Sequence, residues 1–543
     1  MDCYRLSGQI ADVVAGKVIT GTIEVRNGYI HSITEDPGVY GPLILPGLID
    51  AHIHIESSML IPSEFARVAV LHGTTSVVSD PHEIANVLGL NGVRFMMENG
   101  KSVPFNFYFG APSCVPATQF ESAGATLGPS EVEEMLSWKE IKYLSEMMNY
   151  PGVIYNDVNV MQKIAAAKKY NKPIDGHAPA VIGDDLVNYA KAGISTDHEC
   201  STKEEALEKI SLGMKILIRE GSAAKNFDEL ISLISEHPRM VMFCSDDKHP
   251  DDLIAGHINQ LVKRAIDYGF NFMDVLRACT LNPVRHYNLD AGLLQPGDKA
   301  DFIIVDNEVD FNVISTYIDG VKVADQNETL IERKKVTPVN KFTALIPSVQ
   351  DLEVKNEGDS IKVIQAYNGQ LLTSTLHVKP KVMNGLVVSD TERDILKLVV
   401  LNRYQPQKPA IAFIKGFNLK HGAIASTVAH DSHNIIALGV VDNDIVEAIK
   451  LVIENKGGIS LYTKDINYSL SLPVAGLMSL DDARVVAAEY DEINKAVHKA
   501  GSTLDSPFMT LSFMSLLVIP ELKLSDKGIF DSTNFSFTKL FDN

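Results

Sequence analysis

The chain has 543 residues, of which 45% are hydrophobic, and a formal net charge of −20 at pH 7. This length exceeds one ordinary core and predicts two to four domains at roughly 150 residues each. Because the charge is acidic and no basic cluster offsets it, composition argues against nucleic-acid and anionic-membrane partners and favours a small-molecule substrate.

The cysteines and the absence of apolar spans indicate the compartment. The five cysteines are scattered and include no C-x-x-C pair, which predicts free thiols in a reducing environment. Residues 1–40 lack a basic segment followed by an apolar core and a cleavage site, and no stretch approaches about 20 uninterrupted apolar residues. We therefore expect a cytoplasmic protein that does not enter the membrane.

The first two predicted regions differ in pattern. Residues 1–42 contain short β-rich pieces separated by glycines, which predict a small sheet of hairpins. From 43 to 289, strand-like apolar runs alternate with helical stretches, as is typical of βα units around a parallel sheet. Eight such runs close a (β/α)8 barrel. They lie at 45–54, 74–80, 105–111, 141–147 (the weakest), 173–178, 194–199, 215–221 and 241–247.

Two further regions follow the barrel. Residues 290–345 resume β character and are expected to complete the N-terminal β domain. Residues 346–543 predict a C-terminal α+β domain. Its predicted elements are strands near 361–367 and 371–378 and helices near 390–402, 443–456 and 480–500. The predicted fold class is α/β: a metal-dependent (β/α)8 TIM-like barrel, a small β-sandwich domain formed by the N-terminal and post-barrel segments, and the C-terminal α+β domain.

Nearly every barrel run ends in a residue that can bind metal or move protons. In a (β/α)8 barrel the carboxyl ends of the strands converge on one mouth, so we expect these side chains to lie together. In chain order they are His52, His54, Asp80, His82, Glu146, His177, His198, Glu220, Asp246 and Asp247. The i, i+2 spacing of the first pair also places both imidazoles on one face of a strand.

Four of these imidazoles and two carboxylates exceed what one tetrahedral zinc needs. They suit two divalent ions that share a bridging carboxylate and a bridging hydroxide. The predicted ligands are His52, His54 and Asp246 for one ion, His177 and His198 for the other, and Glu146 as the bridge. Taken singly, His177 could be a turn residue and His198 a capping or packing residue. The donor set has no thiolate and suits manganese, iron or zinc.

Three other strand-end residues are predicted to contact the substrate, namely His82, Glu220 and Asp247. The first lies on a proline-stiffened loop, where N-capping by Asp80 is the alternative feature. A salt bridge to lysine or arginine is the alternative for Glu220. Asp247 directly follows a predicted ligand and turns inward only if its strand has ended, and Glu199 is assigned a structural role on the same reasoning.

The segment Pro46–His54 resembles the metal-dependent amidohydrolase superfamily, whose members bind metals at the mouth of such a barrel. More narrowly, several motifs resemble the adenine deaminases of bacteria and archaea. They are HIESSM at 54–59, SDPHEIANV at 79–87, EMMN at 146–149, SDD at 245–247, VAHDSHNI at 428–435 and PFMTLSF at 507–513. Many related binuclear enzymes bridge their metals with a carboxylated lysine, whereas this chain offers Glu146, which agrees with the adenine deaminase pattern. The resemblance covers most of the chain.

The resemblance implies hydrolytic deamination of adenine to hypoxanthine and ammonia in purine salvage, with the free base preferred to the nucleoside. Metal coordination lowers the pKa of water from 15.7 to about 7 and so supplies hydroxide for attack on C6. Asp246 would take the proton of this hydroxide and pass it on, next to the bridging Glu146. We expect two ions, manganese or iron with zinc as the alternative, adenine as the partner and a homo-oligomer of two or more subunits.

Alternatives stay open at this point. A cyclic amide hydrolase, similar to hydantoinase or dihydroorotase, could use the same barrel, and a metal-free barrel could act as a binding or scaffold subunit. Zinc deaminases with H-x-E and P-C-x-x-C motifs are excluded because the chain has no C-x-x-C. His430, Asp431 and His433 are compatible with an extra metal site, a hydrogen-bonded loop, or a lid or subunit contact near the mouth.

Overall fold

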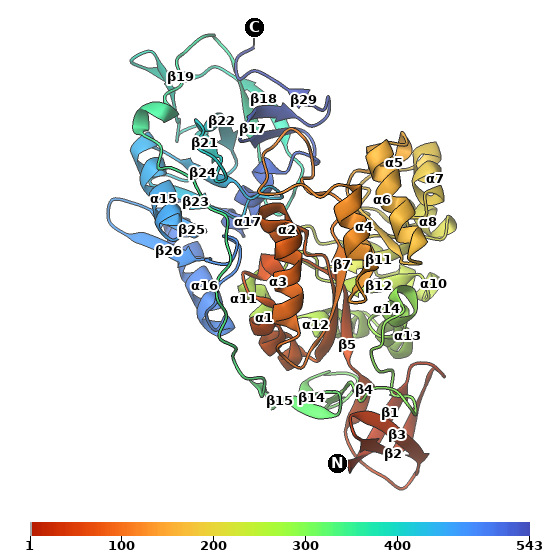
Figure 1. The fold of residues 1–543 in the computed structure, drawn as a ribbon. Helices are drawn as coiled ribbons and strands as arrows, with labels where there is room; N and C mark the ends of the chain where they lie inside the picture. Colours follow the sequence, from red (N-terminus) through yellow and green to blue (C-terminus); the bar gives the residue numbers. More distant parts are fainter. Residues whose placement is uncertain (1–2, 543) are drawn as a thin grey trace.

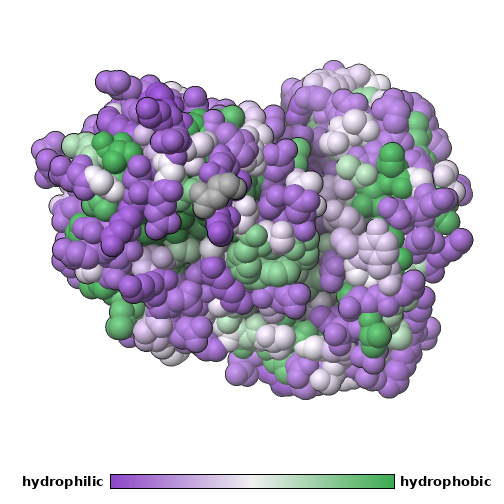
Figure 2. All heavy atoms as spheres, turned by 90° about the horizontal axis from the view of Figure 1, so that it is seen from above, coloured by the Kyte–Doolittle hydropathy of each residue, from purple (hydrophilic) through white to green (hydrophobic). Residues whose placement is uncertain are grey.

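The structure is a computed structural model and describes residues 3–542. Figure 1 shows a β domain at the foot of the molecule, a barrel above it and a C-terminal region along the flank of the barrel. Hydrophilic residues predominate on the face seen in Figure 2, with hydrophobic side chains scattered among them. Within residues 3–542, no helix has the length and apolar character needed to cross a membrane.

The β domain is built from the two segments that flank the barrel in sequence. Its eight-stranded sheet has the order β16-β15-β14-β13-β4-β1-β2-β3. The strands are β1 (Cys3–Asp12), β2 (Lys17–Arg26), β3 (Tyr29–Glu35), β4 (Leu43–Pro46), β13 (Phe302–Val305), β14 (Val313–Ile318), β15 (Val321–Asp325) and β16 (Glu328–Thr329). Ile10, Ile23, Ile44 and Phe302 pack in one buried cluster, so apolar contacts as well as backbone bonds join the two segments.

The eight predicted barrel strands are confirmed, including the weak fourth. They are β5 (Leu48–Ile53), β6 (Thr74–Ser79), β7 (Asn106–Ala111), β8 (Ile141–Met147), β9 (Ile174–Gly176), β10 (Thr196–Asp197), β11 (Lys215–Arg219) and β12 (Val241–Cys244). Parallel pairing runs from β5 to β9 and from β10 to β12. Ser195 N donates to Ile174 O at 2.9 Å, and Asp246 N donates to His52 O at 2.9 Å. These bonds close both seams of the barrel.

The first predicted run, 45–54, is divided at Gly47 into β4 and β5. A Cβ at Gly47 would lie 2.1 Å from the Oγ1 of Thr75 on β6. Only glycine therefore allows the chain to pass this closely beneath the neighbouring strand as it leaves the β domain.

Helices surround the barrel strands, as Figure 1 shows. They are η1 (Ile55–Ser58), α1 (Pro62–Ala69), η2 (Val70–His72), α2 (His82–Leu88), α3 (Leu90–Gly100), α4 (Pro129–Ser137), α5 (Tyr150–Ile154), α6 (Val158–Lys169), α7 (Gly183–Lys191), α8 (Lys203–Ser211), α9 (Phe227–Leu230), α10 (Leu233–Glu236), α11 (Pro250–Ala255), α12 (Ile258–Asp267), α13 (Phe272–Ala278) and α14 (Leu281–Tyr287). In α12, Ile258, Leu261, Val262 and Ala265 are buried, which is the helical spacing of a single apolar face.

The C-terminal region contains a second eight-stranded sheet, in the order β18-β17-β22-β21-β24-β23-β25-β26. These strands are β17 (Ile361–Gln365), β18 (Ser374–Val378), β21 (Leu396–Leu401), β22 (Ala410–Lys415), β23 (Ala423–Ser426), β24 (Ile435–Gly439), β25 (Gly458–Tyr462) and β26 (Asn467–Ser471). The other elements are η3 (Val349–Leu352), β19 (Lys381–Met383), β20 (Leu386–Val388), α15 (Asp442–Glu454), α16 (Ala483–Lys499), α17 (Pro507–Ser512), η4 (Phe513–Ser515), β27 (Leu522–Ser525), β28 (Gly528–Asp531) and β29 (Ser536–Phe537).

The predicted strands near 361–367 and 371–378 are confirmed as β17 and β18, and the predicted helices near 443–456 and 480–500 as α15 and α16. The predicted helix near 390–402 is wrong. Residues 396–401 form β21, every residue of which is buried, between β22 and β24. A strand covered on both faces shows no alternation, so its continuous apolar run does not differ in pattern from a buried helix.

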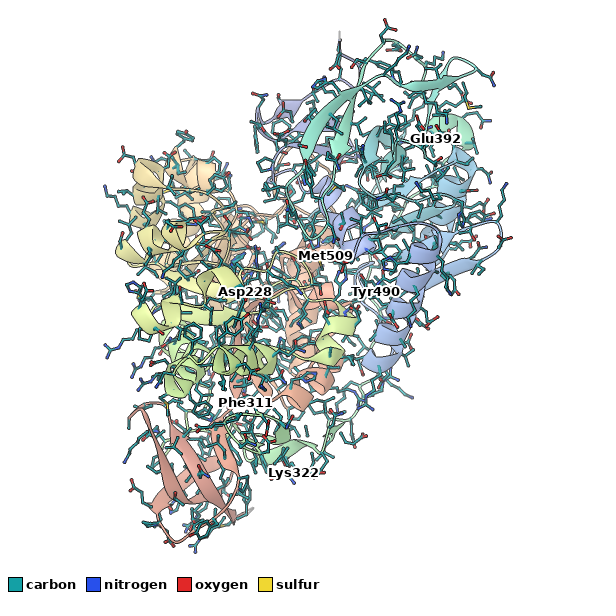
Figure 3. All side chains as sticks on the ribbon, turned by 180° about the vertical axis from the view of Figure 1, so that it is seen from behind. Asp228, Phe311, Lys322, Glu392, Tyr490 and Met509 are labelled. Atoms are coloured by element: carbon teal, nitrogen blue, oxygen red, sulfur yellow. The ribbon has the colours of Figure 1, made fainter. Side chains whose placement is uncertain are left out.

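The C-terminal region packs directly on the barrel. Tyr490 of α16, labelled in Figure 3, contacts His249 before α11 through its hydroxyl, which lies 2.5 Å from the Nδ1 of the imidazole. On the same side, Arg67 of α1 pairs with Asp482 at 3.1 Å, and Ser479 N donates to Met59 O at 2.7 Å. These contacts hold α16 and the segment before it against the barrel.

Candidate active site

The two histidines of the HxH motif meet Asp246 at the mouth of the barrel. The Nε2 atoms of His52 and His54 lie 3.2 Å apart. The Oδ1 of Asp246 lies 3.5 Å from the first Nε2 and 3.2 Å from the second. All three residues are at least 95% buried. Asp246, with φ of 55°, follows the end of β12, and this left-handed backbone turns its side chain toward the histidines.

Glu146, near the end of β8, lies between the two predicted sets of ligands. Its Oε1 is 3.3 Å from the Nε2 of His54. Its Oε2 is 2.9 Å from the Nδ1 of His177 and 3.2 Å from the Nε2 of His198. Each carboxylate oxygen therefore faces a different set of imidazoles, which is the position that a bridging ligand requires.

The donor set fits two divalent ions. Within the described chain, candidate ligand atoms of His52, His54 and Asp246 lie within 4.8 Å of one another, as do those of His52, Glu146 and His198. The Nε2 of His177 is buried and has no hydrogen-bond partner among the described residues. Buried nitrogens rarely stay unsatisfied, so this atom is available to a ligand. Imidazole and carboxylate donors without thiolate suit manganese, iron or zinc.

A second layer of contacts orients these donors. The Nδ1 of His54 lies 3.1 Å from the backbone oxygen of Asp80, which directs the opposite nitrogen toward the cluster. Behind the HxH motif, the fully buried Asp50 accepts bonds from His52 N at 3.2 Å and from Ser245 N at 3.1 Å. The Nε2 of His257 lies 2.8 Å from the same carboxylate. Asp50 therefore holds the end of β5, which carries His52 and His54, against the end of β12, which leads to Asp246.

The electrostatics favour ionised carboxylates in this cluster. Burial by itself would raise the pKa of Asp246, but the Arg219 guanidinium and the bonds from His52 and His54 hold that pKa well below its usual range. Burial acts in the same sense on Glu146, whose pKa is nevertheless held well below its usual range by the surrounding histidines. Both carboxylates are therefore charged at neutral pH and available to bind cations.

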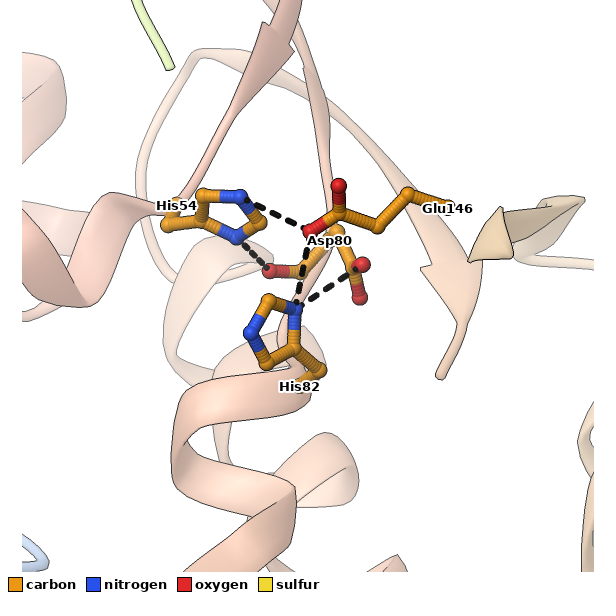
Figure 4. Close-up of side chains that lie close together, drawn as sticks. All are labelled: His54, Asp80, His82 and Glu146. Carbon is orange, nitrogen blue, oxygen red and sulfur yellow. Dashed lines mark hydrogen bonds and ion pairs between the residues drawn. The ribbon is translucent and has the colours of Figure 1, made fainter. Parts of the chain in front are cut away.

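His82 lies at the edge of this cluster, as Figure 4 shows. Its Nδ1 is 3.0 Å from the Oδ2 of Asp80 and 3.5 Å from the Oε1 of Glu146. Asp80 does not cap α2, because the N-cap position is Pro81 and no side chain caps that helix. The alternative of N-capping is therefore wrong, and Asp80 instead orients the imidazole toward the mouth.

Glu220 does not join the cluster, which contradicts the prediction that it contacts the substrate. Its carboxylate pairs with Arg264 at 3.3 Å and is absent from the described residues that line the cavity. Arg219, the residue before it, points inward and lies 2.6 Å from Asp246. Glu220 N still donates to Cys244 O of β12 at 3.1 Å, so the backbone stays extended at this position and the side chain of Glu220 points away from that of Arg219. The alternative of a salt bridge is the arrangement found.

Glu199 and Asp247 both line the cavity. The structural role assigned to Glu199 is too narrow, because its Oε1 lies 3.3 Å from the Nε2 of His198 and its carboxylate also contacts Arg219. β10 ends at Asp197, so strand alternation no longer applies to Glu199. Asp247 likewise follows the end of its strand and accepts a bond from Ser57 Oγ at 2.5 Å.

The prediction from sequence missed Arg219 and Glu83 as residues of the cavity. The only signal for Arg219 was its place as the last residue of the seventh strand. Glu83, in α2, pairs with the Nδ1 of His430 at 2.5 Å and contacts the Nε2 of His433. Both histidines belong to the loop 427–434 between β23 and β24, which thus reaches from the C-terminal sheet to the mouth of the barrel.

The cavity combines charged and apolar walls. Most of its charged and imidazole groups lie at the barrel end, and the C-terminal region adds His430, Asp431 and apolar side chains. The lining residues are His54, His82, Glu83, Glu146, Met148, His177, His198, Glu199, Arg219, Ala223, Ala224, Asp246, Asp247, Leu371, His430, Asp431, Phe513 and Leu516. Apolar walls with a few polar groups are typical of a small-molecule site.

Comparisons with known proteins agree with this geometry. Residues 43–323 match the family model "Amidohydrolase family", and residues 370–536 match "Adenine deaminase C-terminal domain". The chain is 52% identical to an adenine deaminase of Salinibacter ruber, over 99% of both chains. It is 52% identical to that of Methanosarcina barkeri over the whole of both chains, and 45% identical to that of Borreliella burgdorferi over 99% and 100%.

Solved structures with similarity to this chain match it in part. A β-aspartyl dipeptidase from Fervidobacterium islandicum covers 62% of this chain and 100% of its own, with 18% identity and a TM-score of 0.47. An N-isopropylammelide isopropylaminohydrolase from Burkholderia multivorans covers 61% of this chain and 100% of its own, with 15% identity and a TM-score of 0.45.

Proposed function

The chain belongs to the adenine deaminases of the amidohydrolase family, and we propose that it hydrolyses adenine to hypoxanthine and ammonia at the mouth of its barrel. The observation that carries this proposal is the position of Glu146, whose two oxygens face separate sets of histidines. A cyclic amide hydrolase with a bridging lysine is not favoured, because the described lining residues include this glutamate and no lysine.

The proposed metal centre holds two divalent ions, manganese or iron, with zinc as the alternative. His52, His54 and Asp246 would hold one ion, His177 and His198 the other, and Glu146 both. When bound, such ions supply Lewis acidity and an ionised water at neutral pH. Asp80 and Asp50 keep the histidine motif in place for this purpose through the contacts described above.

Asp246 is the proposed proton carrier of the reaction. Water adds to C6 of the base and the bond from C6 to the amino nitrogen breaks, so one proton of the water must reach ring N1 and the other the amino group, which leaves as ammonia. Asp246 is ionised and lies within hydrogen-bond reach of the HxH motif, where it can accept that proton and release it to the amino group. Arg219 holds the carboxylate in this position throughout the transfer.

The remaining walls bind and orient the base. His82 and Asp247 offer polar atoms to the purine edge, and Met148, Leu371 and Phe513 offer apolar surface to its faces. A buried polar group left without a partner would cost a wrong substrate about 1–3 kcal/mol. A cytoplasmic location and assembly as a homo-oligomer stay predictions; gel filtration with light scattering would determine the assembly.

The experiment measures ammonia release from adenine by protein loaded with manganese or iron, beside Glu146→Gln and Asp246→Asn. We expect turnover by the wild type and a loss of about 100-fold or more in each variant, with metal content reduced in Glu146→Gln. Glu133→Gln, at an exposed ion pair on α4, is the matched control and should stay active. No ammonia from fully metallated wild type would refute the proposal.

A further inference from the structure

The loop 427–434 brings one carboxyl group into the cavity that the proposed metal centre does not use. Asp431 is 97% buried and lines the cavity together with His430. Its Oδ2 has no hydrogen-bond partner among the described residues. A buried carboxylate oxygen without a partner is costly unless a ligand satisfies it.

The neighbours of Asp431 place its carboxylate next to His82, where the proposed substrate lies against the metal cluster. Its Oδ1 lies 3.9 Å from the Nε2 of His82 and 3.9 Å from the Nδ1 of His430. The opposite nitrogen of His82 is 3.5 Å from Glu146. The imidazole of His82 therefore lies between Asp431 and the carboxylate of Glu146. A purine placed with C6 at Glu146 spans a comparable length.

The loop is held rigidly, so the position of Asp431 is set before any ligand binds. His430 N donates to Ser512 O at 3.1 Å, and His433 N donates to Ala429 O at 2.7 Å. Tyr404 OH donates to Ser432 O at 2.6 Å. A group held in this way binds with little further loss of conformational entropy.

The neighbouring histidines, His430 and His433, form a closed hydrogen-bonded cluster with Glu83. This arrangement bears on whether the motif 430–433 is an extra metal site, a hydrogen-bonded loop, or a lid or subunit contact. The Nδ1 of His433 accepts a bond from Ala429 N at 3.2 Å, so its Nε2 carries the proton and donates to Glu83. Neither nitrogen is then free for a metal. The extra metal site is not favoured, and the motif instead supports the carboxyl group between its two histidines.

We propose that the Asp431 carboxylate accepts the ring N–H of the imidazole half of adenine and thereby makes the C-terminal region the determinant of free-base specificity. A nucleoside carries its sugar on N9, so it has no N–H to offer there and would leave the carboxylate unsatisfied. Phe513, which stacks on His430 with ring centroids 4.7 Å apart, lines the same wall of the cavity. This inference rests on the proposed function.

The test compares adenine with 9-methyladenine in the metal-loaded wild type, Asp431→Ala and Asp431→Asn. The readouts are kcat and KM for adenine and the inhibition constants of hypoxanthine and 9-methyladenine, which report binding apart from turnover. In Asp431→Ala we expect the KM for adenine and the inhibition constant of hypoxanthine to rise about 10- to 100-fold, with kcat changed far less. Asp431→Asn keeps one acceptor oxygen and should recover part of this loss.

The decisive quantity is the preference for bases that keep the N–H. In Asp431→Ala, the ratio of the inhibition constants of 9-methyladenine and hypoxanthine should fall at least 10-fold below that of the wild type. An unchanged ratio would overturn the inference, as would a loss confined to kcat. Asp465→Asn, an exposed residue of the same region, controls for nonspecific effects. Wild type that fails to deaminate adenine would instead refute the proposed function itself.

Discussion

Arg219, the last residue of β11, lies 2.6 Å from the Oδ2 of Asp246 through its Nη1, and the same guanidinium contacts Glu199. It therefore joins the residues that follow β10 and β12 across the mouth of the barrel. All three side chains are buried, so removing the guanidinium takes away the cation that the two carboxylates share.

We predict that Arg219→Met lowers the free energy of unfolding by about 3–5 kcal/mol, because breaking a buried ion pair strands its charges. Urea unfolding of wild type and variant measures this loss. Arg94→Met, at an ion pair whose side chains are about half exposed, is the control and should cost less than about 1 kcal/mol. Equal losses in the two variants would contradict the interpretation that the buried Arg219 holds Glu199 and Asp246 in place.

Glu199 and Glu220 should respond differently to the same substitution. Glu199→Gln weakens a buried contact to Arg219 and His198, and we expect kcat/KM for adenine to fall about 10-fold or more. Glu220→Gln affects only a partly exposed pair with Arg264 and should change kcat/KM less than about twofold. Steady-state kinetics of both variants measure the difference. A larger effect at Glu220 would contradict the placement of Glu220 outside the cavity.

Gly47 permits the close approach of β5 to β6. Because an added Cβ would meet Thr75 at 2.1 Å, we predict that Gly47→Ala costs about 1–3 kcal/mol of stability. The double variant Gly47→Ala with Thr75→Ala should regain part of this loss, since the Oγ1 of Thr75 makes no hydrogen bond within the described chain. Thermal unfolding of the two single variants and the double variant tests the coupling, and strictly additive losses would argue against this steric cause.

His249, at the contact with Tyr490, should make stability depend on acid pH. Burial lowers the pKa of His249 to about 3, so the folded chain keeps this ring neutral while the unfolded chain takes up a proton below about pH 6.5. Between pH 6.5 and 3 this residue therefore removes up to about 1.4 kcal/mol of stability per pH unit as the pH falls.

In His249→Gln this contribution disappears, because glutamine does not titrate. We expect the variant to be less stable than wild type at pH 7.5 and the difference to narrow between pH 6.5 and 5, as measured by unfolding midpoints at each pH. His31→Gln, at an exposed position on β3, is the matched control. A constant difference between His249→Gln and wild type over this range would be inconsistent with a neutral buried ring.

Much of the barrel and of the candidate site could be predicted from the amino-acid pattern alone. His52 and His54 share a face because strand side chains alternate, and the ends of parallel strands meet at one mouth, which brings in Glu146, His177 and Asp246. These inferences need only local periodicity and strand count. They therefore required no knowledge of any long-range contact.

Tertiary packing decided the rest. Whether residues 396–401 form a helix or β21 depended on the burial of both faces of the segment, and the inward turn of Glu199 depended on where β10 ended. Asp431 reaches the barrel from hundreds of residues away in sequence. Local pattern shows which face of an element is apolar, but which distant segment covers that face depends on the packing free energy of the whole fold.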